Sequence, residues 1–275
     1  MRYVGHYTLL VWAILIAAAL AEGAIRTVRG RGEDYDWRAF AVSLLDMFLR
    51  IAILVVVPFT ILSPVTHFVA RHALPPVPMR SGGAFAALFL GHEFVYYAYH
   101  LGAHRIRWFW ANHVVHHAPA QLNLAVGLRN GTVGNLIGYG IFYLPLIGAG
   151  FSFVAIDAML TACLAYQFFL HSPCLPKLGP LEGWLNTPSA HRVHHAKNPE
   201  YVDANFGGVL LVFDRLFGTY RAERDDIPCR YGVAGLADSH NPFRVELGPW
   251  RELAKDIAAQ RSPRGLARAL LGPPR

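Results

Sequence analysis

The chain has 275 residues, of which 54% are hydrophobic and 16% are charged, and its formal net charge is +7. Soluble domains carry about a quarter charged residues, so this composition argues against an ordinary water-soluble domain and favours a membrane protein. The positive charge fits a chain that lies against anionic lipid head groups. A nucleic-acid-binding protein is disfavoured, because no basic patch is interleaved with aromatic residues on a soluble domain.

Five apolar stretches follow one another along the chain, and each reaches the roughly 20 residues that a bilayer-crossing helix needs. They cover about residues 7–25, 39–70, 82–99, 132–150 and 151–170. For the first stretch a signal peptide is the alternative, but a strongly basic start and a small-residue cleavage site are lacking, so we interpret it as a retained span. The sequence therefore predicts an all-α fold, an integral membrane helical bundle in a single domain over residues 1–275.

Basic residues beside the apolar stretches predict the orientation of the chain. The segment after the first stretch contains four arginines, whereas the segment before the third contains two: Arg26, Arg29, Arg31 and Arg38 against Arg71 and Arg80. By the positive-inside rule the N-terminus is expected outside, and residues 171–275 form a cytoplasmic histidine-rich helical cap and tail. In that tail, residues 250–271 predict either an interfacial amphipathic segment broken at Pro263 or a solvated terminal helix.

Eight histidines lie in three short clusters on the predicted cytoplasmic side. The first cluster has the pattern HxxxH and the other two have the pattern HxxHH: His100 and His104; His113, His116 and His117; His191, His194 and His195. Because residues i, i+3 and i+4 share one face of a helix, each cluster is expected to aim its imidazoles at one point. Eight imidazoles are more than one zinc or iron ion needs, so the pattern predicts two metal ions.

Three polar residues within or beside the spans lie near the predicted site, and two of them are expected to belong to it. His171 ends the fifth stretch, four residues after Gln167, and is predicted to be a further metal ligand. Glu93 lies two helical turns before His100 on the same face, where it is expected to hydrogen-bond a ligand imidazole. We interpret His92 first as a packing residue, with a metal-ligand or substrate-contact role as the alternatives.

The remaining histidines and the cysteines are interpreted as structural. Four separate histidines belong to no cluster and are not expected to be metal ligands: His6, His67, His72 and His240. Three cysteines predict no disulfide framework. One of them, Cys163, lies within a span and is interpreted as a packing residue.

An all-imidazole site does not identify its metal, because zinc, copper, iron and nickel all accept nitrogen ligands. The clusters contain no carboxylate, which disfavours hydrolysis by a metal-bound water and a positioned base. A metal pair beside a bilayer favours activation of dioxygen against an unactivated C–H bond. Two other classes stay open: a metal transporter, disfavoured because the histidines gather at one membrane face, and a zinc-stabilised membrane scaffold with a closed site.

These motifs resemble those of the fatty acid hydroxylase superfamily of integral-membrane di-iron oxygenases, which includes sterol desaturases and alkylglycerol monooxygenase. The resemblance covers about residues 85–222 and rests on the histidine clusters and their flanking motifs: Tyr96-Tyr97, Asn186-Thr-Pro188, Asn205-Phe-Gly207 and Asp214-Arg-Leu-Phe-Gly-Thr-Tyr220. Asn123-Leu-Ala125 with Leu128-Arg129 is most similar to the alkylglycerol monooxygenase or bacterial sterol-desaturase-like branch. The chain departs from the family pattern at Glu93, Ala98 and Leu101, where the family has aspartate, tryptophan and arginine.

The resemblance implies a monooxygenase or desaturase that holds two iron ions and uses dioxygen on a lipid, whether a sterol, a fatty acyl chain or an ether lipid. Electrons would come from a separate ferredoxin- or cytochrome-type donor with its reductase, because no dinucleotide, iron–sulfur or haem motif occurs in the chain. The implied iron ligands are His100, His104, His113, His116, His117, His171, His191, His194 and His195. The resemblance also makes Asp203, Asn205 and Asp214 candidates for positioning the ligands, with loop and helix-end capping as the alternative.

Overall fold

The computed structural model describes residues 6–31, 35–57, 60–236 and 239–274, in which every regular element is a helix and strand-like pairing is confined to isolated bridges. The longest helices are α1 (His6–Arg26), α2 (Trp37–Val56), α4 (Gly82–Arg105), α7 (Phe153–Leu170) and α10 (Pro242–Ala258). The shorter ones are η1 (Thr27–Arg31), α3 (Ser63–Arg71), α5 (Arg107–His117), η3 (Leu124–Leu128), η4 (Tyr139–Tyr143), α6 (Leu144–Gly148), η5 (Gly179–Leu181), α8 (Pro188–His195), α9 (Val212–Phe217) and α11 (Pro263–Leu271). The predicted all-α class is confirmed.

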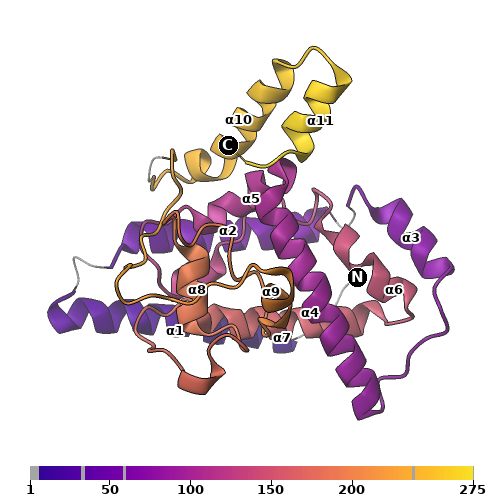
Figure 1. The fold of residues 1–275 in the computed structure, drawn as a ribbon, viewed down its shortest axis with the longest axis horizontal. Helices are drawn as coiled ribbons and strands as arrows, with labels where there is room; N and C mark the ends of the chain where they lie inside the picture. Colours follow the sequence, from indigo (N-terminus) through magenta and orange to yellow (C-terminus); the bar gives the residue numbers. More distant parts are fainter. Residues whose placement is uncertain (1–5, 32–34, 58–59, 237–238, 275) are drawn as a thin grey trace.

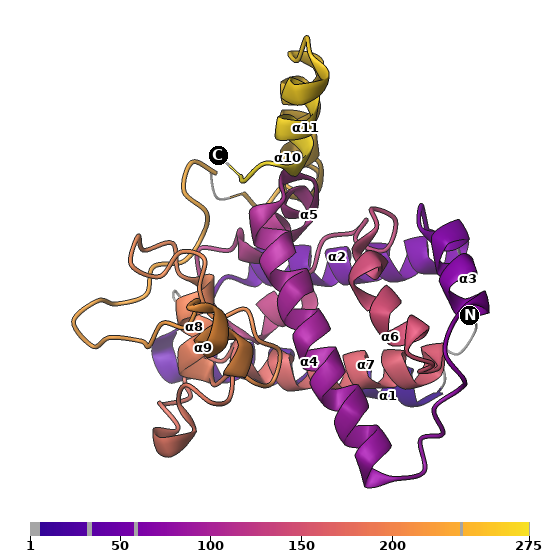
Figure 2. The same ribbon diagram turned by 45° about the vertical axis from the view of Figure 1, so that its right-hand side comes forward.

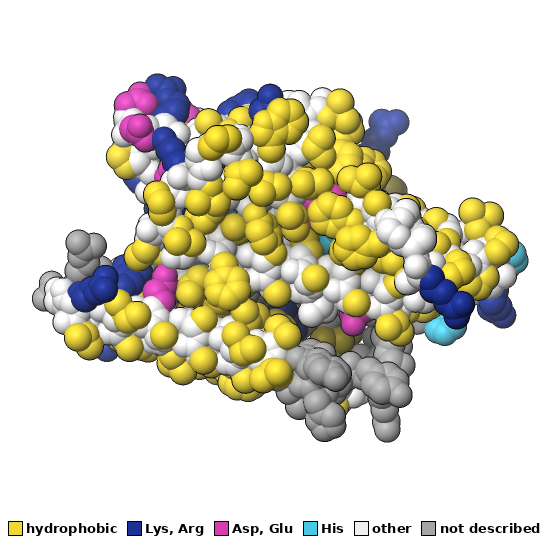
Figure 3. All heavy atoms as spheres, turned by 90° about the horizontal axis from the view of Figure 1, so that it is seen from below, with side chains coloured by type: hydrophobic (Ala, Val, Ile, Leu, Met, Phe, Trp, Pro, Cys, Tyr) yellow, Lys and Arg dark blue, Asp and Glu magenta, His cyan; other side chains and the backbone are white. Residues whose placement is uncertain are grey.

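Three helical segments are long and apolar enough to cross a membrane: Leu10–Gly30, α2 and α7. Figures 1 and 2 show α1, α2 and α7 lying roughly along one direction, with α4 crossing them obliquely. Large apolar side chains on these helices are exposed, among them Phe48, Val55 and Val154, and Figure 3 shows a broad face covered largely by hydrophobic side chains. Water-soluble monomers rarely expose apolar patches of this extent, so the bundle is built to sit in lipid.

The expected span over residues 132–150 is not a single helix, so this prediction is wrong, and the second stretch is a candidate span only over α2. The stretch 39–70 is divided between α2 and α3. The stretch 132–150 consists of turns followed by η4 and α6. Gly138, before η4, has a φ of +99°, a left-handed conformation that interrupts an α-helix, and Pro145 lies in the first turn of α6, where it cannot donate a helical hydrogen bond.

The helices bury two apolar clusters that flank the histidine-bearing segments. The first joins α1, α2, η3 and α7 through residues such as Leu15, Met47 and Phe168. The second joins α4, α6 and α7 and includes Leu88 and Ile156. Close packing of such side chains fixes α4 and α7 against the segment between them, and within lipid it does so by van der Waals contact rather than by removal of apolar surface from water.

The C-terminal helices α10 and α11 form a hairpin that projects from the rest of the chain (Figures 1 and 2). The break between them falls at Pro263, where the sequence predicts it. The hairpin is anchored on α5 by an edge-on contact of Trp250 with Trp108, whose ring centroids lie 5.2 Å apart, and by an ion pair between Arg107 and Asp256. Whether this hairpin lies in the lipid interface stays a prediction.

We expect Gly150→Ala to destabilise the fold. Gly150 has a φ of +90°, and a Cβ there would lie 2.4 Å from the backbone oxygen of Pro75. The left-handed conformation alone costs an alanine about 1 kcal/mol, and the overlap adds to it, so the thermal unfolding midpoint of the protein in detergent should fall. Gly179→Ala is the matched control, because Gly179 also has a positive φ of +59° but no atom lies within 4 Å of its added Cβ. Equal midpoints for the two variants would contradict the clash.

Candidate metal centre

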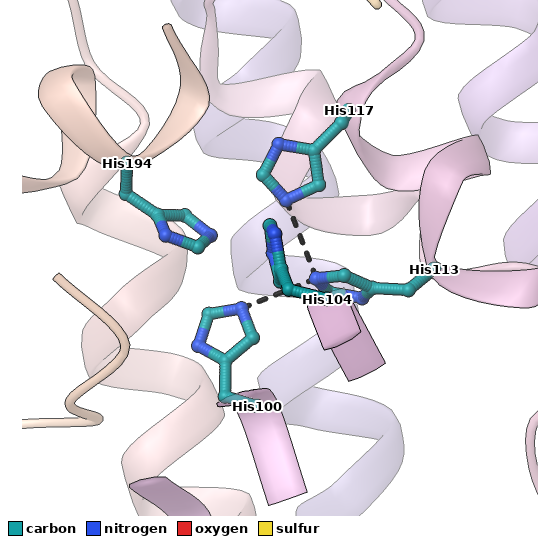
Figure 4. Close-up of side chains that lie close together, drawn as sticks. All are labelled: His100, His104, His113, His117 and His194. Atoms are coloured by element: carbon teal, nitrogen blue, oxygen red, sulfur yellow. Dashed lines mark hydrogen bonds between the residues drawn. The ribbon is translucent and has the colours of Figure 1, made fainter. Parts of the chain in front are cut away.

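The predicted histidine ligands all converge, and they form two buried groups. The five-histidine group has its ligand nitrogens within 4.8 Å of one another, and so does the four-histidine group; the first is His100, His104, His113, His117 and His194, and the second is His116, His171, His191 and His195. Figure 4 shows the imidazoles of the five-histidine group pointing toward one another from separate segments. The structure therefore brings together the eight clustered histidines and His171.

Each HxxHH cluster divides between the two groups, so the expectation that a cluster aims at a single point is wrong for both. On α5, His113 and His117 enter the five-histidine group while His116 enters the four-histidine group. On α8, two histidines enter the four-histidine group and only His194 enters the other. Residues i and i+4 lie close in angle around a helix, whereas i+3 and i+4 differ by about 100°. Each helix thus supplies both groups.

Backbone carbonyls hold four of the imidazoles by their outer nitrogen. The Nδ1 atoms lie 2.7–2.9 Å from carbonyl oxygens in four pairs: His100 with Phe206, His116 with Arg129, His171 with Gln167, and His194 with Ala204. A carbonyl oxygen can only accept, so Nδ1 donates in each pair. A neutral imidazole has one N–H, and Nε2 of these rings therefore presents a lone pair toward the interior of its group. This is the arrangement that metal-binding histidines use to fix their tautomer.

The facing nitrogens of His116 and His171 are suited to bind a cation. Their Nε2 atoms lie 3.4 Å apart, yet both rings use their single proton on Nδ1, so two lone pairs oppose each other. A second proton is disfavoured because burial lowers the pKa of His116 to about 3 and that of His171 to about 4. A metal ion bound by both nitrogens removes this repulsion, which no hydrogen bond can do.

The spacing of the two groups fits two neighbouring metal ions. Nε2–Nε2 distances within the groups are 3.1–3.4 Å, which two ligands of one ion reach at metal–nitrogen distances of about 2.0–2.1 Å. Nε2 of His104 and Nε2 of His194 are buried and have no hydrogen-bond partner among the described residues. The groups adjoin, since the rings of His117 and His195 lie 4.4 Å apart. The residues present therefore fit a pair of ions.

A loop of residues 203–210 (the 203–210 loop) supports the five-histidine group from outside. Its carbonyls receive the Nδ1 protons of His100 and His194. The buried carboxylate of Asp214 accepts the N–H groups of Phe206 and Gly207 at 2.7 and 2.8 Å. Asn205 has a φ of +58°, and its side-chain amide donates to two backbone carbonyls. Asp214 and Asn205 thus act on the ligands through the backbone of this loop.

Glu93 and Asp203 lie near the ligands in different ways. Glu93 is placed against the 203–210 loop rather than against the His100 imidazole, since its Oε2 accepts the N–H groups of Val209 and Leu210 at 2.8 and 2.6 Å. The predicted direct hydrogen bond from Glu93 to a ligand is replaced by support of the loop. Asp203 forms an ion pair with Arg105 at 2.8 Å, and its other oxygen lies 3.7 Å from Nδ1 of His104.

Two residues of the site have roles that the sequence analysis did not assign. Arg129, whose side chain is buried and bonds to α2 at Ser43, offers the carbonyl that holds His116. Asn186 donates from its buried amide to the carbonyls of Gly207 and Gly208. In the sequence only the motifs Leu128-Arg129 and Asn186-Thr-Pro188 signalled them. The role of Arg129 is performed by its backbone carbonyl and leaves no mark on the residue type, and that of Asn186 depends on a loop about 20 residues away in the chain.

Of the histidines expected outside the site, those that the structure describes do lie outside it. His67 and His72 are exposed and their rings contact carbonyls of their own helix. His240 pairs with Asp36 at 2.6 Å. The side chain of His6 lies outside the described residues.

Comparison with known proteins places these motifs in a family. The family model for fatty acid hydroxylase matches residues 85–219. Alkylglycerol monooxygenase of Xenopus tropicalis is 36% identical over 178 residues, and that of Homo sapiens is 39% identical over 171 residues. Ornithine lipid hydroxylase OlsE of Rhizobium tropici is 28% identical over 159 residues.

The matches cover more than half of this chain but less than half of each relative. The match with the Xenopus tropicalis protein spans 64% of this chain and 39% of that protein. The match with the human protein spans 62% of this chain and 37% of that protein, and the match with the Rhizobium tropici protein spans 55% of this chain and 47% of that protein. Among solved structures none matches the chain.

We expect Asp214→Asn to lower metal affinity without removing a ligand. The amide keeps one acceptor oxygen but places an NH₂ group against an N–H of Phe206 or Gly207, so the 203–210 loop shifts and the His100 and His194 rings lose their alignment. Loss of such outer partners costs about 10–100-fold in metal affinity. Competition with a chelator measures it, and the exposed Asp225→Asn is the control. An unchanged affinity would show that the loop does not position the rings.

The metal-free protein should lose stability as the pH falls below 6.5, the ordinary pKa of histidine. Burial lowers the pKa of His116 and of His194 to about 3 in the folded chain. Between pH 6.5 and about pH 3 these histidines are protonated in the unfolded chain but neutral in the folded chain. The free energy of unfolding therefore decreases as the pH falls. The thermal midpoint of chelator-treated protein should therefore drop between about pH 7 and pH 5. A constant midpoint would contradict neutral, buried imidazoles.

Proposed function

Because residues 85–219 belong to the fatty acid hydroxylase superfamily, we propose that the protein is a membrane-bound di-iron oxygenase that hydroxylates or desaturates a lipid. The substrate class is a sterol, a fatty acyl chain or an ether lipid. The named relatives act as alkylglycerol monooxygenase and ornithine lipid hydroxylase, which supports a lipid substrate and an oxygenation reaction.

The observation that carries the proposal is the pair of adjoining imidazole groups with opposed lone pairs at His116 and His171. Both groups consist of histidine alone, and each group offers more than three nitrogens. A hydrolytic metal site commonly adds a carboxylate base beside its metal-bound water, and among the described residues neither group contains one. Two bound irons would supply the activation of dioxygen that attack on an unactivated C–H bond requires.

The chain's own residues orient the centre and limit access of water to it. Carbonyls fix the tautomers of four ligand rings, and all nine histidines are buried. The centre lies where α4 ends, since α4 runs from Gly82 in an apolar stretch to His100 and His104 near its C-terminus. Apolar side chains such as Phe85 and Leu90 are exposed along α4. A lipid chain lying against this helix would reach the histidines without passing through water.

The proposed partners follow from what the site requires. Reduction of dioxygen needs electrons from a separate donor of ferredoxin or cytochrome type with its reductase. We place the protein in the membrane as a multi-pass chain, with the centre on the cytoplasmic face as the arginine distribution predicts. The three apolar helices support membrane association.

Lipid extracts from cells that express the protein test the proposed reaction. Growth under ¹⁸O₂ should give a lipid with a labelled hydroxyl group, or a new double bond, and His194→Ala should lower the product at least about 100-fold, since outer partners alone cost 10–100-fold. His240→Ala is the matched control, because this histidine lies outside both groups. The protein purified in detergent should contain about two irons per chain.

Two results would overturn the proposal. Uptake of zinc or iron into vesicles without any lipid change would indicate a metal transporter. Tightly held zinc that stabilises the chain, with no dioxygen-dependent product in the expressing cells, would indicate a structural site of a membrane scaffold.

A further inference from the structure

A third group of possible metal ligands lies in the core between α4 and α7, separate from the nine histidines. It consists of His92, Glu93 and Cys163, whose ligand atoms lie within 4.8 Å of one another. Oε1 of Glu93 is at the centre, 3.9 Å from Nδ1 of His92 and 3.9 Å from Sγ of Cys163. All three residues are buried, with exposed fractions of 0, 1 and 3%. We refer to them as the α4–α7 triad.

His92 has no hydrogen bond in this position, although it is wholly buried. Neither of its ring nitrogens has a hydrogen-bond partner among the described residues. Leaving a buried polar group without a hydrogen bond is destabilising, and both nitrogens of this imidazole are in that position. Its ring neighbours are the phenol rings of Tyr96 and Tyr143 at 6.0 and 5.9 Å, and the buried Tyr143 hydroxyl has no hydrogen-bond partner either. Packing alone does not explain a histidine here, since a leucine would fill the space without this cost.

Glu93 and Cys163 each present an atom that can coordinate a metal ion. Oε2 of Glu93 is occupied by the N–H groups of Val209 and Leu210, which leaves Oε1 directed at Cys163 and His92. The Cys163 sulfur receives an N–H from Gln167 at 3.1 Å, a bond that stabilises a thiolate more than a thiol. The Cys163 thiol donates a long hydrogen bond to Oε1 of Glu93 at 3.9 Å, and an ion bound to both atoms would replace it.

We propose that the α4–α7 triad binds one additional divalent ion of the zinc class. Imidazole, carboxylate and thiolate together form a ligand set that Zn²⁺ accepts, at about 2.0–2.3 Å from each atom. The thiolate excludes Mg²⁺ and Ca²⁺, which take oxygen ligands. Binding would release the Cys163 proton and would give a ring nitrogen of His92 a partner. The ion would also balance the charge of the Glu93 carboxylate inside the helix bundle.

The 203–210 loop joins this site to the histidine centre. A Cβ on Gly208 would lie 2.7 Å from the Cys163 sulfur and 3.1 Å from Oε1 of Glu93, so the loop backbone closes over the triad. The carbonyl of Phe206 in the same loop holds His100. An ion in the triad would thus join α4 to α7, and through Glu93 it would be connected to this loop.

Cobalt substitution tests the proposal with a signal that the histidine centre cannot give. The full-length protein in detergent is stripped with a chelator and titrated with Co²⁺. Thiolate ligation produces a sulfur-to-cobalt charge-transfer band in the near ultraviolet, whereas a site of imidazoles alone produces none. We expect the band in the unaltered protein and in Cys174→Ser and Cys229→Ser, the matched controls for the other thiols, and we expect its loss in Cys163→Ser and Cys163→Ala.

Two further measurements keep the test independent of folding and of the oxygenase proposal. His92→Ala retains the thiol, so the band should persist but need at least about 10-fold more Co²⁺ to reach half its intensity. His194→Ala should keep the band at its normal concentration even though it damages the histidine centre. A missing band in the unaltered protein, or a band that survives in both Cys163 variants, would overturn the site. Loss of lipid oxidation alone would bear on the proposed function and not on this ion.

Discussion

The centre depends on one electrostatic constraint, which is that buried imidazole lone pairs face one another at hydrogen-bond distance with no proton between them. His116 and His171 show this most clearly, since their outer nitrogens both donate to carbonyls and their inner nitrogens lie 3.4 Å apart. Without a cation this arrangement is repulsive, and burial prevents protonation from relieving it. The surrounding helices hold the rings in place by packing on both sides of the centre.

The residues that maintain this constraint act mainly through backbone atoms. Asp214 accepts N–H groups in the middle of the 203–210 loop and Glu93 accepts those at its C-terminal end, while Asn186 donates to carbonyls between them. The loop in turn offers carbonyls to His100 and His194. Two buried carboxylates therefore act on the histidine rings through the loop, and among the described residues both histidine groups consist of histidine alone.

The convergence of these histidines could be predicted from the sequence because the histidine spacing and the helix period act together. His171 was also predictable, since it ends an apolar helix on the same side as the clusters. The assignment of His113 and His116 to different groups was not, because it depends on how α5 is rotated against α8. The role of Glu93 was also misjudged, since helical spacing shows a shared face but not a loop more than 100 residues later that competes for the carboxylate. The broken stretch 132–150 was misread because hydropathy ignores the backbone conformation of Gly138.

The crosswise supply of ligands by α5 and α8 has a consequence for how the centre is assembled. Each group draws on residues near position 115 and residues near position 193, so neither group is complete in one stretch of chain. In the two-ion centre that we propose, the first ion would tie α5 to α8 and would position rings of the other group. Loading of the second ion would then be assisted by the first, and both would require that these distant segments have already met.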